Sequence, residues 1–401
     1  MPHDAISVTL GTGSGPYQKT LALSLLREGM LRRVLSSGLV LEIQEPGPNG
    51  SLEVTQRFPV SNFVNRALWA VWRRVPGRFL PSPAMFSALL SDYFWSRRIP
   101  PCTIYHGWSG CEPCLLAAKR LGAITLVENP ARHPRHWHLA GVEECKRFGV
   151  APRDHSVPLS SRLIHRMLRE FELCDRIIVP SSLSYRSFEE CGLADKTVVV
   201  TTAVDTESFT PQPRPEHRPL FRACFVGRVE MAKGVGYLLQ AWKKLALANA
   251  ELVLVGAVKP EMNSLLRTHA DSTVRLTGSV PAQEVARLYR ESDLFVFPSV
   301  NEGFAQVLME AMASGLAVVA SDYSGATDCV SDGKEGFIVP VRDVDRLAEA
   351  IWWCYQHPDE TRAMGLAARA RIEGHFTLDH YSQRQIALYR KLAGERAGQA
   401  T

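Results

Sequence analysis

The sequence lacks long uninterrupted apolar runs, and no basic segment leads into an apolar core near its first residues. A membrane-spanning helix needs about 18 or more consecutive apolar residues, and no segment of the 401 residues supplies them. The opening stretch, MPHDAISVTLGTGSG, breaks at Gly11 and is typical of a buried strand rather than a signal peptide. We therefore expect a cytoplasmic protein.

Strong charge of one sign is also missing. Lysine and arginine total 46 against 41 for aspartate and glutamate, which gives a net charge of +5. So small an excess suits an anionic ligand or a membrane surface better than duplex DNA. No nucleic-acid partner is predicted.

A recognisable metal site is lacking as well. Cys111 and Cys114 form one C-x-x-C without a second pair, and His133, His136 and His138 are clustered without further ligands at a known spacing. The nine cysteines are expected to be reduced thiols that mostly fill the core. We predict no metal and no other cofactor.

Short apolar runs that alternate with helical patterns dominate the chain instead. This alternation is typical of βαβ units and parallel sheets, and a chain of 401 residues with 46% hydrophobic composition can bury two cores. Strands are expected at Ala5–Leu10, Thr103–Tyr105, Ala123–Val127, Arg176–Val179 and Thr197–Val200, and then at Phe221–Val226, Glu251–Val255, Thr273–Leu276, Leu294–Phe297, Ala317–Ala320 and Gly336–Val339. The predicted fold class is α/β, with two Rossmann-like domains.

The two groups of strands are separated by TPQPRPEHRP, residues Thr210–Pro219. Four prolines in ten residues cannot lie inside a regular element, so this segment is predicted to be a linker. We predict an N-terminal domain over 1–209 and a C-terminal domain over 217–376. A last helix, capped by Thr377, is expected within 377–401 and to cross back to the N-terminal domain.

A basic and aromatic region interrupts this rhythm. Between Arg57 and Arg98, seven arginines accompany a single acid, Asp92, and alternate with tryptophan and phenylalanine. Residues 64–75 fit an amphipathic helix. Such a helix either packs on the sheet or contacts an anionic membrane surface or a lipid acceptor, and the sequence leaves both interpretations open.

The stretch FVGRVEMAKGVGYLLQAW carries two candidate ligand-binding cations. Gly227 follows an apolar run, and a helical pattern starts near Gly234. Arg228 and Lys233 therefore lie at the carboxyl edge of the predicted sheet, where α/β proteins bind ligands. Both cations could reach a diphosphate there, although single basic residues in loops are more often simply solvated.

The stretch NEGFAQVLMEAMASG carries two carboxylates around one predicted helix. Its start near Gly303 to Gln306 offers free amides to an anion, with Glu302 just outside. Glu310 lies in an otherwise apolar stretch, where a carboxylate needs donors such as sugar or ribose hydroxyls. On a helix, positions eight apart lie about 12 Å and about 80° from each other. The simpler interpretations are a helix-dipole cap and a solvated helix face.

Together, GRVEMAKG and EGFAQVLMEAMASGLAVVASDYSGATDCVSDGKEGFIV resemble the C-terminal domain of retaining GT-B glycosyltransferases, in particular glycosyltransferase family 4. The E-x7-E pair of that family corresponds to Glu302 and Glu310, and the resemblance covers nearly all of residues 217–395. It implies a GT-B fold, in which two Rossmann-like domains face a central cleft.

The resemblance also implies a role for each matching residue. Arg228 and Lys233 would hold the diphosphate of a nucleotide sugar, Glu310 the ribose hydroxyls, and Glu302 the transferred sugar. The two cations and the helix end would replace a divalent metal in stabilising the departing diphosphate. The implied donor-binding set is Gly13, Gly15, Gly227, Arg228, Lys233, Gly278, Glu302, Gly303, Phe304, Ala305 and Glu310.

The N-terminal half matches the family less closely. GTGSG, Gly11 to Gly15, resembles its glycine-rich turn, but the histidine that many members carry after the strand at Ala123–Val127 is replaced here by Asn129 in LVENPARHP. His133 is the first candidate for a displaced catalytic histidine and His106 the second, and a purely structural histidine is an equal alternative. His106, Glu128 and Asn129 are the candidates on the acceptor side.

The resemblance implies a metal-independent hexosyltransferase that retains the anomeric configuration. Its donor would be a nucleotide diphosphate sugar, a UDP-sugar first and GDP-mannose next. Its acceptor would be a hydroxyl of a glycan, a lipid-linked sugar or a cell-surface polysaccharide precursor, with peripheral contact to the cytoplasmic face of the inner membrane. Two alternatives stay open: a nucleotide-sugar epimerase of the same fold, with its carboxylates on the N-terminal side of the cleft, and a non-catalytic partner that only binds sugar nucleotides.

Overall fold

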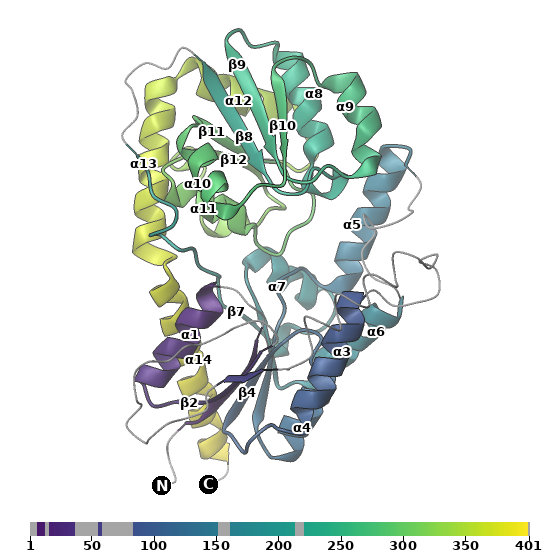
Figure 1. Cartoon of the computed structure of the whole chain (residues 1–401), viewed down its shortest axis with the longest axis vertical. Helices are drawn as coiled ribbons and strands as arrows, with labels where there is room; N and C mark the ends of the chain where they lie inside the picture. The colour runs from purple at the N-terminus through teal and green to yellow at the C-terminus, as the bar shows by residue number, and fades with distance from the viewer. Residues whose placement is uncertain are drawn as a thin grey trace.

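The computed structural model describes residues 6–12, 16–36, 55–57, 83–150, 161–212 and 220–399. It consists of two parallel sheets, each covered by helices, which lie one above the other in Figure 1. The predicted α/β class and two-sheet GT-B architecture are therefore confirmed. Most of the basic and aromatic region, including residues 64–75, and the turn at Gly13–Gly15 lie outside the described residues.

The first sheet has the strand order β3-β2-β1-β4-β5-β6-β7, and every pair is parallel. Its strands are β1 (Val8–Thr12), β2 (Leu31–Ser36), β3 (Thr55–Arg57), β4 (Ile104–Trp108), β5 (Ile124–Glu128), β6 (Arg176–Val179) and β7 (Thr197–Val199). Its helices are α1 (Pro16–Arg27), α3 (Pro83–Ser96), α4 (Glu112–Arg120), α5 (Pro134–Arg147), α6 (Ser161–Leu173) and α7 (Ser182–Glu189). The sequence prediction missed β2 and β3, because LRRVLS and TQR carry arginine and polar residues where a buried strand normally has apolar ones.

The second sheet has the order β10-β9-β8-β11-β12-β13 and is also parallel. Its strands are β8 (Phe221–Val226), β9 (Ala250–Val255), β10 (Val274–Gly278), β11 (Leu294–Phe297), β12 (Ala317–Ser321) and β13 (Gly336–Val339), and its helices are α8 (Val235–Leu245), α9 (Asn263–His269), α10 (Ala282–Arg290), α11 (Gln306–Ala313), α12 (Val344–Gln356) and α13 (Pro358–His375). All six strands agree with the prediction to within two residues at either end. The reason is that β11 and β12 are buried at every position, as expected for a parallel sheet covered on both faces, and so read as continuous apolar runs.

The last helix, α14 (Leu378–Gln399), belongs to the core of the first half although it follows the second half in the chain. It lies beside α1 in Figure 1, and its buried Tyr381 and Tyr389 pack in one cluster with Leu10 and Leu126 of the first sheet. The Thr377 hydroxyl accepts a hydrogen bond from the His380 amide at 3.4 Å and so caps the helix. This crossing fixes the two halves to each other by a continuous chain segment.

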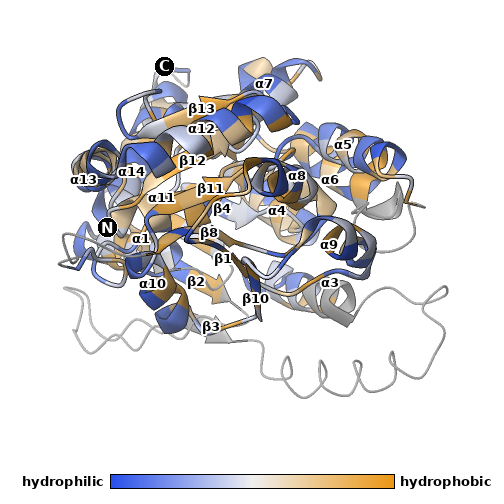
Figure 2. Cartoon of the chain, turned by 90° about the horizontal axis from the view of Figure 1, so that it is seen from above, coloured by the Kyte–Doolittle hydropathy of each residue, from blue (hydrophilic) through white to orange (hydrophobic). Residues whose placement is uncertain are grey.

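The hydropathy of the ribbon follows the layers. Figure 2 shows hydrophobic strands inside a shell of helices whose outer sides are hydrophilic. Within the described ranges, no helix is both long enough and apolar enough to cross a membrane.

Candidate functional site

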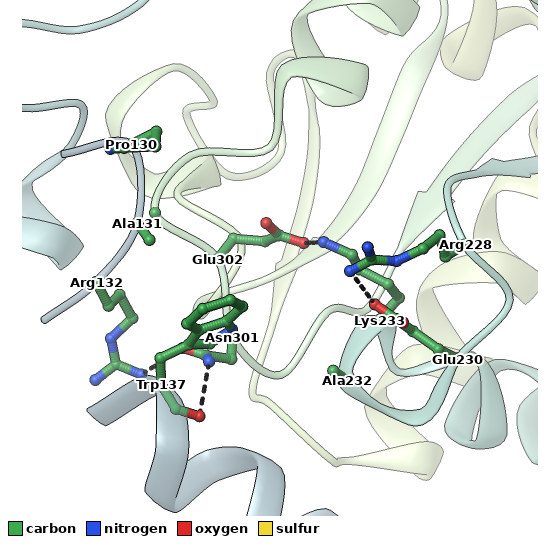
Figure 3. Close-up of a pocket in the computed structure, with 11 residues that line it drawn as sticks. Pro130, Ala131, Arg132, Trp137, Arg228, Glu230, Ala232, Lys233, Asn301 and Glu302 are labelled. Atoms are coloured by element: carbon green, nitrogen blue, oxygen red, sulfur yellow. Dashed lines mark hydrogen bonds and ion pairs between the residues drawn. The ribbon is translucent and has the colours of Figure 1, made fainter. Parts of the chain in front are cut away.

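A cleft of about 190 Å³ lies where the loop after β5 meets the carboxyl edge of the second sheet. Residues from both halves line it: Pro130, Ala131, Arg132, Trp137, Arg228, Glu230, Ala232, Lys233, Asn301, Glu302 and Gly303. Figure 3 shows Glu302 and Lys233 meeting near its middle. The cleft thus brings together Arg228, Lys233, Glu302 and Gly303, four of the residues that the sequence singled out.

Lys233 is held by a short loop at the end of β8. The loop closes in the 3-10 turn Met231–Lys233, after which Gly234 adopts φ +71 and begins α8. A Cβ at Gly234 would lie 1.9 Å from the carbonyl oxygen of Pro298. Only glycine fits that contact and that backbone conformation, so this residue fixes Lys233 against the strand end that carries Glu302.

Each predicted cation is paired with a carboxylate. The Lys233 ammonium forms an ion pair with Glu302, whose Oε1 also accepts a hydrogen bond from the Ser299 hydroxyl at 3.1 Å. Arg228 pairs with Glu230 at 2.9 Å, and the Arg228 side chain is 56% exposed while that of Glu230 is 3% exposed. Since Arg228 is tethered at one end and open to solvent at the other, it can turn towards a ligand in the cleft.

Glu302 does not lie on the same helix as Glu310. The helix α11 begins only at Gln306, and residues 301–305 form an irregular loop. The predicted helix start near Gly303 to Gln306 agrees with α11, but no continuous helix joins Glu302 to Glu310, so the helical spacing of about 12 Å does not apply to this pair. The loop is irregular because Glu302 and Ala305 donate their amides to the carbonyls of Tyr323 and Ser324, at 3.1 Å and 3.0 Å.

Gly303 joins the two halves at the floor of the cleft. Its carbonyl accepts hydrogen bonds from the hydroxyls of Ser181 and Ser184, at 2.5 Å and 3.2 Å. A Cβ at Gly303 would lie 2.0 Å from the carbonyl oxygen of Pro130. The next residue, Phe304, is buried. The amide of Ala305 already donates to the carbonyl of Ser324, so only the amides of Gly303 and Phe304 are left for the anion site predicted over Gly303 to Ala305.

Glu310 is a partly buried carboxylate with little hydrogen bonding. Its Oε2 accepts one long hydrogen bond, 3.5 Å, from the Tyr289 hydroxyl. Burial raises the pKa of Glu310 from 4.5 to about 7, and the Tyr289 hydrogen bond opposes that rise only in part. A carboxylate in this position would gain from hydroxyl donors on a ligand.

Three glycines end neighbouring strands of the second sheet. The carbonyl of Gly278, the last residue of β10, accepts a hydrogen bond from the Gly256 amide at 2.9 Å, and a Cβ at Gly256 would lie 1.9 Å from the carbonyl oxygen of Gly227. Gly227 and Gly278 thus lie along the same sheet edge. Neither of them lines the cleft itself.

His106 and Glu128 form a buried cluster with α14. His106 Nδ1 lies 2.6 Å from the Tyr389 hydroxyl and Nε2 lies 3.2 Å from Glu128, which also accepts a hydrogen bond from the Tyr381 hydroxyl at 3.1 Å. The cluster lines a small hollow beside Gly11. Both side chains face this hollow and not the cleft between the halves, so the geometry ties them to the docking of α14.

His133 is also built into the first half. It is 1% exposed, caps α5 by accepting the Arg135 amide at 3.3 Å, and packs against the ring of Phe188. Burial lowers the pKa of His133 to about 4. The geometry favours the structural alternative for this histidine, whereas Asn129 shapes the cleft wall by donating to the carbonyl of Ala131 at 2.6 Å.

Seven of the eleven lining residues were not candidates in the sequence, and three of these are connected to one another across the junction of the halves: Arg132, Trp137 and Asn301. Arg132 is 8% exposed and donates to Asn301 Oδ1 at 3.4 Å, and the Asn301 amide donates to the Trp137 carbonyl at 3.4 Å. Their positions in the sequence could have pointed to them. Arg132 and Trp137 lie next to and shortly after the candidate His133, and Asn301 directly precedes the candidate Glu302. In the parts of the chain that the structure describes, no group of three or more histidine, cysteine or acidic residues could hold a metal ion.

The chain is similar in sequence to known glycosyltransferases. Residues 221–357 match the family described as glycosyl transferases group 1. The chain is 31% identical over 226 residues to the alpha-maltose-1-phosphate synthase of Mycolicibacterium smegmatis, covering 50% of this chain and 58% of that protein. It is 31% identical over 208 residues to the amylovoran biosynthesis glycosyltransferase AmsK of Erwinia amylovora, covering 48% of this chain and 50% of that protein.

The fold is shared with solved glycosyltransferase structures. Anabaena HepE, whose crystal structure contains UDP and glucose, superposes with a TM-score of 0.64 at 15% identity, covering 96% of this chain and 99% of that one. The curated relatives are covered over only 50% to 58% of their length. Residues 221–357 are thus similar to the glycosyl transferases group 1 family, and the two halves of the chain together have the GT-B fold.

Proposed function

We propose that this protein is a retaining glycosyltransferase of family 4, which moves a hexose from a nucleotide diphosphate sugar to an acceptor hydroxyl. The observation that carries the proposal is the cleft at the junction of the two halves, which Arg228, Lys233 and Glu302 of the second half line together, with Lys233 paired to Glu302. The match of residues 221–357 to glycosyl transferases group 1 supports the same assignment.

The diphosphate would take the places of the carboxylates on the two cations. Lys233 and Arg228 already face anionic oxygens, of Glu302 and Glu230, so a diphosphate can exchange for these partners without leaving a cation unpaired. As the bond to the sugar breaks, negative charge grows on the diphosphate, and two fixed cations stabilise it more than they stabilise the intact donor. In this proposal, no metal is required.

Two carboxylates would orient the rest of the donor. Glu302, released from Lys233, would accept hydrogen bonds from the hydroxyls of the transferred sugar. Glu310 would accept them from the ribose, which would relieve the unfavourable burial that raises its pKa to about 7. Retention would follow from attack on the face that the diphosphate leaves, with a phosphate oxygen accepting the acceptor's proton.

We propose a UDP-sugar as donor, with GDP-mannose as the next candidate, and a glycan or lipid-linked polysaccharide precursor as acceptor. The UDP and glucose in the HepE structure support the choice of donor, and the amylovoran biosynthesis named for AmsK supports an acceptor that is built up by glycosyl transfer. Contact with the cytoplasmic membrane face is part of the proposal. Among the described residues of the basic region, Arg97 and Arg98, which follow α3 directly, stack on Tyr93 and Phe94 of that helix, at 4.0 Å and 3.7 Å.

An epimerase on the same fold has less support. Such an enzyme would need acid and base carboxylates on the N-terminal side of the cleft. The lining residues from that side are Pro130, Ala131, Arg132 and Trp137, and both lining carboxylates, Glu230 and Glu302, come from the other half.

The test begins with binding and continues with turnover. UDP, GDP and ADP are titrated into the purified chain while thermal unfolding is followed, since a ligand at about 100 times its dissociation constant stabilises by about 2.7 kcal/mol. The sugar of the preferred nucleotide is then supplied in radiolabelled form. Transfer to a glycan or lipid supports the proposal, release of an isomerised sugar supports the epimerase, and binding without turnover supports a non-catalytic partner.

A further inference from the structure

Arg132 is the cation of the cleft that has no carboxylate partner. Three cations and two carboxylates line the cleft, and Arg228 and Lys233 are paired with Glu230 and Glu302. Among the described residues, no acidic group lies within ion-pair distance of Arg132. Glu190, which follows α7 and is the carboxylate whose charge acts most on Arg132, is instead paired with His136 at 3.2 Å.

The contacts that Arg132 does make are weak. Its guanidinium lies 3.4 Å from Asn301 Oδ1, 3.4 Å from His136 Nδ1 and 4.9 Å from the centre of the Tyr323 ring, and its Nε has no hydrogen-bond partner. The side chain is nevertheless only 8% exposed. A buried guanidinium with an unsatisfied donor is unfavourable unless an anion completes its hydrogen bonds.

The position of Arg132 distinguishes it from the diphosphate ligands. It follows β5 in the first half, whereas Arg228 and Lys233 follow β8 in the second. In Figure 3, Glu302 lies between Arg132 on one side and Lys233 with Arg228 on the other. A ligand whose diphosphate is held by the second pair would therefore place its sugar at Glu302, and Arg132 would face whatever group approaches from beyond that sugar.

We propose that Arg132 binds an acidic group of the acceptor, a carboxylate or a phosphate ester, and so selects an anionic sugar acceptor. This inference rests on the proposed glycosyltransferase function and adds the charge of the acceptor to it. The planar guanidinium can donate two parallel hydrogen bonds to such a group. Asn301 would orient the guanidinium as a positioning residue.

The test compares acidic and neutral sugars on the full chain. With UDP present at saturation and ionic strength held constant, glucuronate, glucose 6-phosphate and glucose are titrated, and the dissociation constants are taken from thermal shifts. We expect the acidic sugars to bind the wild-type protein about tenfold more tightly than glucose, or better. This comparison needs no variant. Equal affinities for all three sugars would overturn the proposal.

Variants then assign the preference to one side chain. Arg132→Gln should abolish the tenfold preference and leave the affinity for UDP unchanged, while Arg132→Lys should retain part of it. Arg135→Gln is the matched control, because Arg135 is an exposed arginine of the same segment that does not line the cleft. An equal loss of preference in the control, or a loss of UDP affinity in Arg132→Gln, would contradict the assignment.

Two further measurements are needed. The first tells whether the acidic group belongs to the donor sugar or to the acceptor, and the second separates the role of Arg132 from the proposed glycosyltransferase function. If Arg132→Gln weakens binding of UDP-glucuronate but not of free glucuronate, the acidic group belongs to the donor sugar and the acceptor assignment is wrong. If UDP fails to bind the wild-type protein, the proposed function fails. The preference for acidic sugars, measured without UDP, then still decides the role of Arg132.

Discussion

Replacing Glu310 by glutamine should stabilise the protein at alkaline pH and weaken nucleotide binding at the same time. The side chain keeps its size and loses its charge. Burial raises the pKa of Glu310 from 4.5 to about 7, which corresponds to a penalty of at most about 3 kcal/mol for the ionised form in the folded protein. Since the residue is only partly buried, a smaller effect of the same sign is the minimum expectation.

The sign of the pH dependence follows from linkage. The folded state holds the proton of Glu310 more tightly than the unfolded state does, so the contribution to stability is fully present below pH 4.5 and is lost as the pH rises through about 7. Glu310→Gln should therefore differ little from wild type at pH 5 and be more stable at pH 8. Urea unfolding at both pH values measures this difference, and Glu189→Gln, a change at an exposed glutamate of α7, is the control.

Binding of UDP should reveal the same group. Ribose hydroxyls that donate to Glu310 favour its ionised form, so binding at pH 7 should release about half a proton from a group that is half protonated there. Calorimetry in buffers of different ionisation enthalpy measures that release. Glu310→Gln should abolish it and weaken UDP binding by about tenfold or more.

The result that would refute this reasoning is specific. A stability difference of the same size at pH 5 and pH 8 would show that the pKa of Glu310 is not raised. Unchanged UDP affinity and unchanged proton release would show that Glu310 does not contact the ribose. If Glu310→Gln is more stable and binds UDP more weakly than the wild type, then Glu310 lowers the stability of the protein but is needed for binding.

Three further outcomes follow from the described contacts. Lys233→Ala should weaken the binding of UDP about tenfold or more, measured by calorimetry, and change the affinity for uridine little, because the lysine faces the predicted diphosphate position. Equal losses of affinity for both ligands would contradict that position. Gly303→Ala should destabilise the protein by about 1–3 kcal/mol in urea unfolding, since its Cβ would lie 2.0 Å from a carbonyl oxygen of the other half, while Gly374→Ala, in open space on α13, should be neutral or stabilising. Tyr389→Phe should cost about 1–3 kcal/mol by the same measurement, because it leaves His106 Nδ1 buried without its partner, and should not change UDP affinity; a large loss of affinity would give the α14 cluster a role in binding.

The second half of the molecule could be predicted closely from the sequence. Its inner strands, β8, β9, β11 and β12, are mostly buried and so appear as apolar runs with clear ends, and Arg228, Lys233 and Glu302 follow the ends of β8 and β11. In a parallel sheet all such ends meet at one edge. Local sequence order was therefore enough to predict that these three residues lie close together.

The first half could be predicted less well, because its important contacts join residues far apart in the chain. His106 and Glu128 were candidates for the acceptor side, but α14 returns from the far end of the sequence and engages both through Tyr389 and Tyr381. His133 is a candidate for catalysis in the sequence, whereas in the structure its side chain caps α5 and packs against aromatic rings. The local sequence around a histidine does not show whether its side chain faces a ligand or the protein core.

The sequence by itself determined the α/β class, the two halves and the edge at which Arg228 and Lys233 lie, because apolar periodicity and strand ends are local properties of a chain. Only the tertiary structure decided that Glu302 forms an ion pair with Lys233, that Glu310 is short of hydrogen-bond donors, and that Arg132 lines the cleft from the other half. These three facts depend on contacts between segments that are far apart in the chain, and burial and pairing of that kind leave no period or spacing in the sequence.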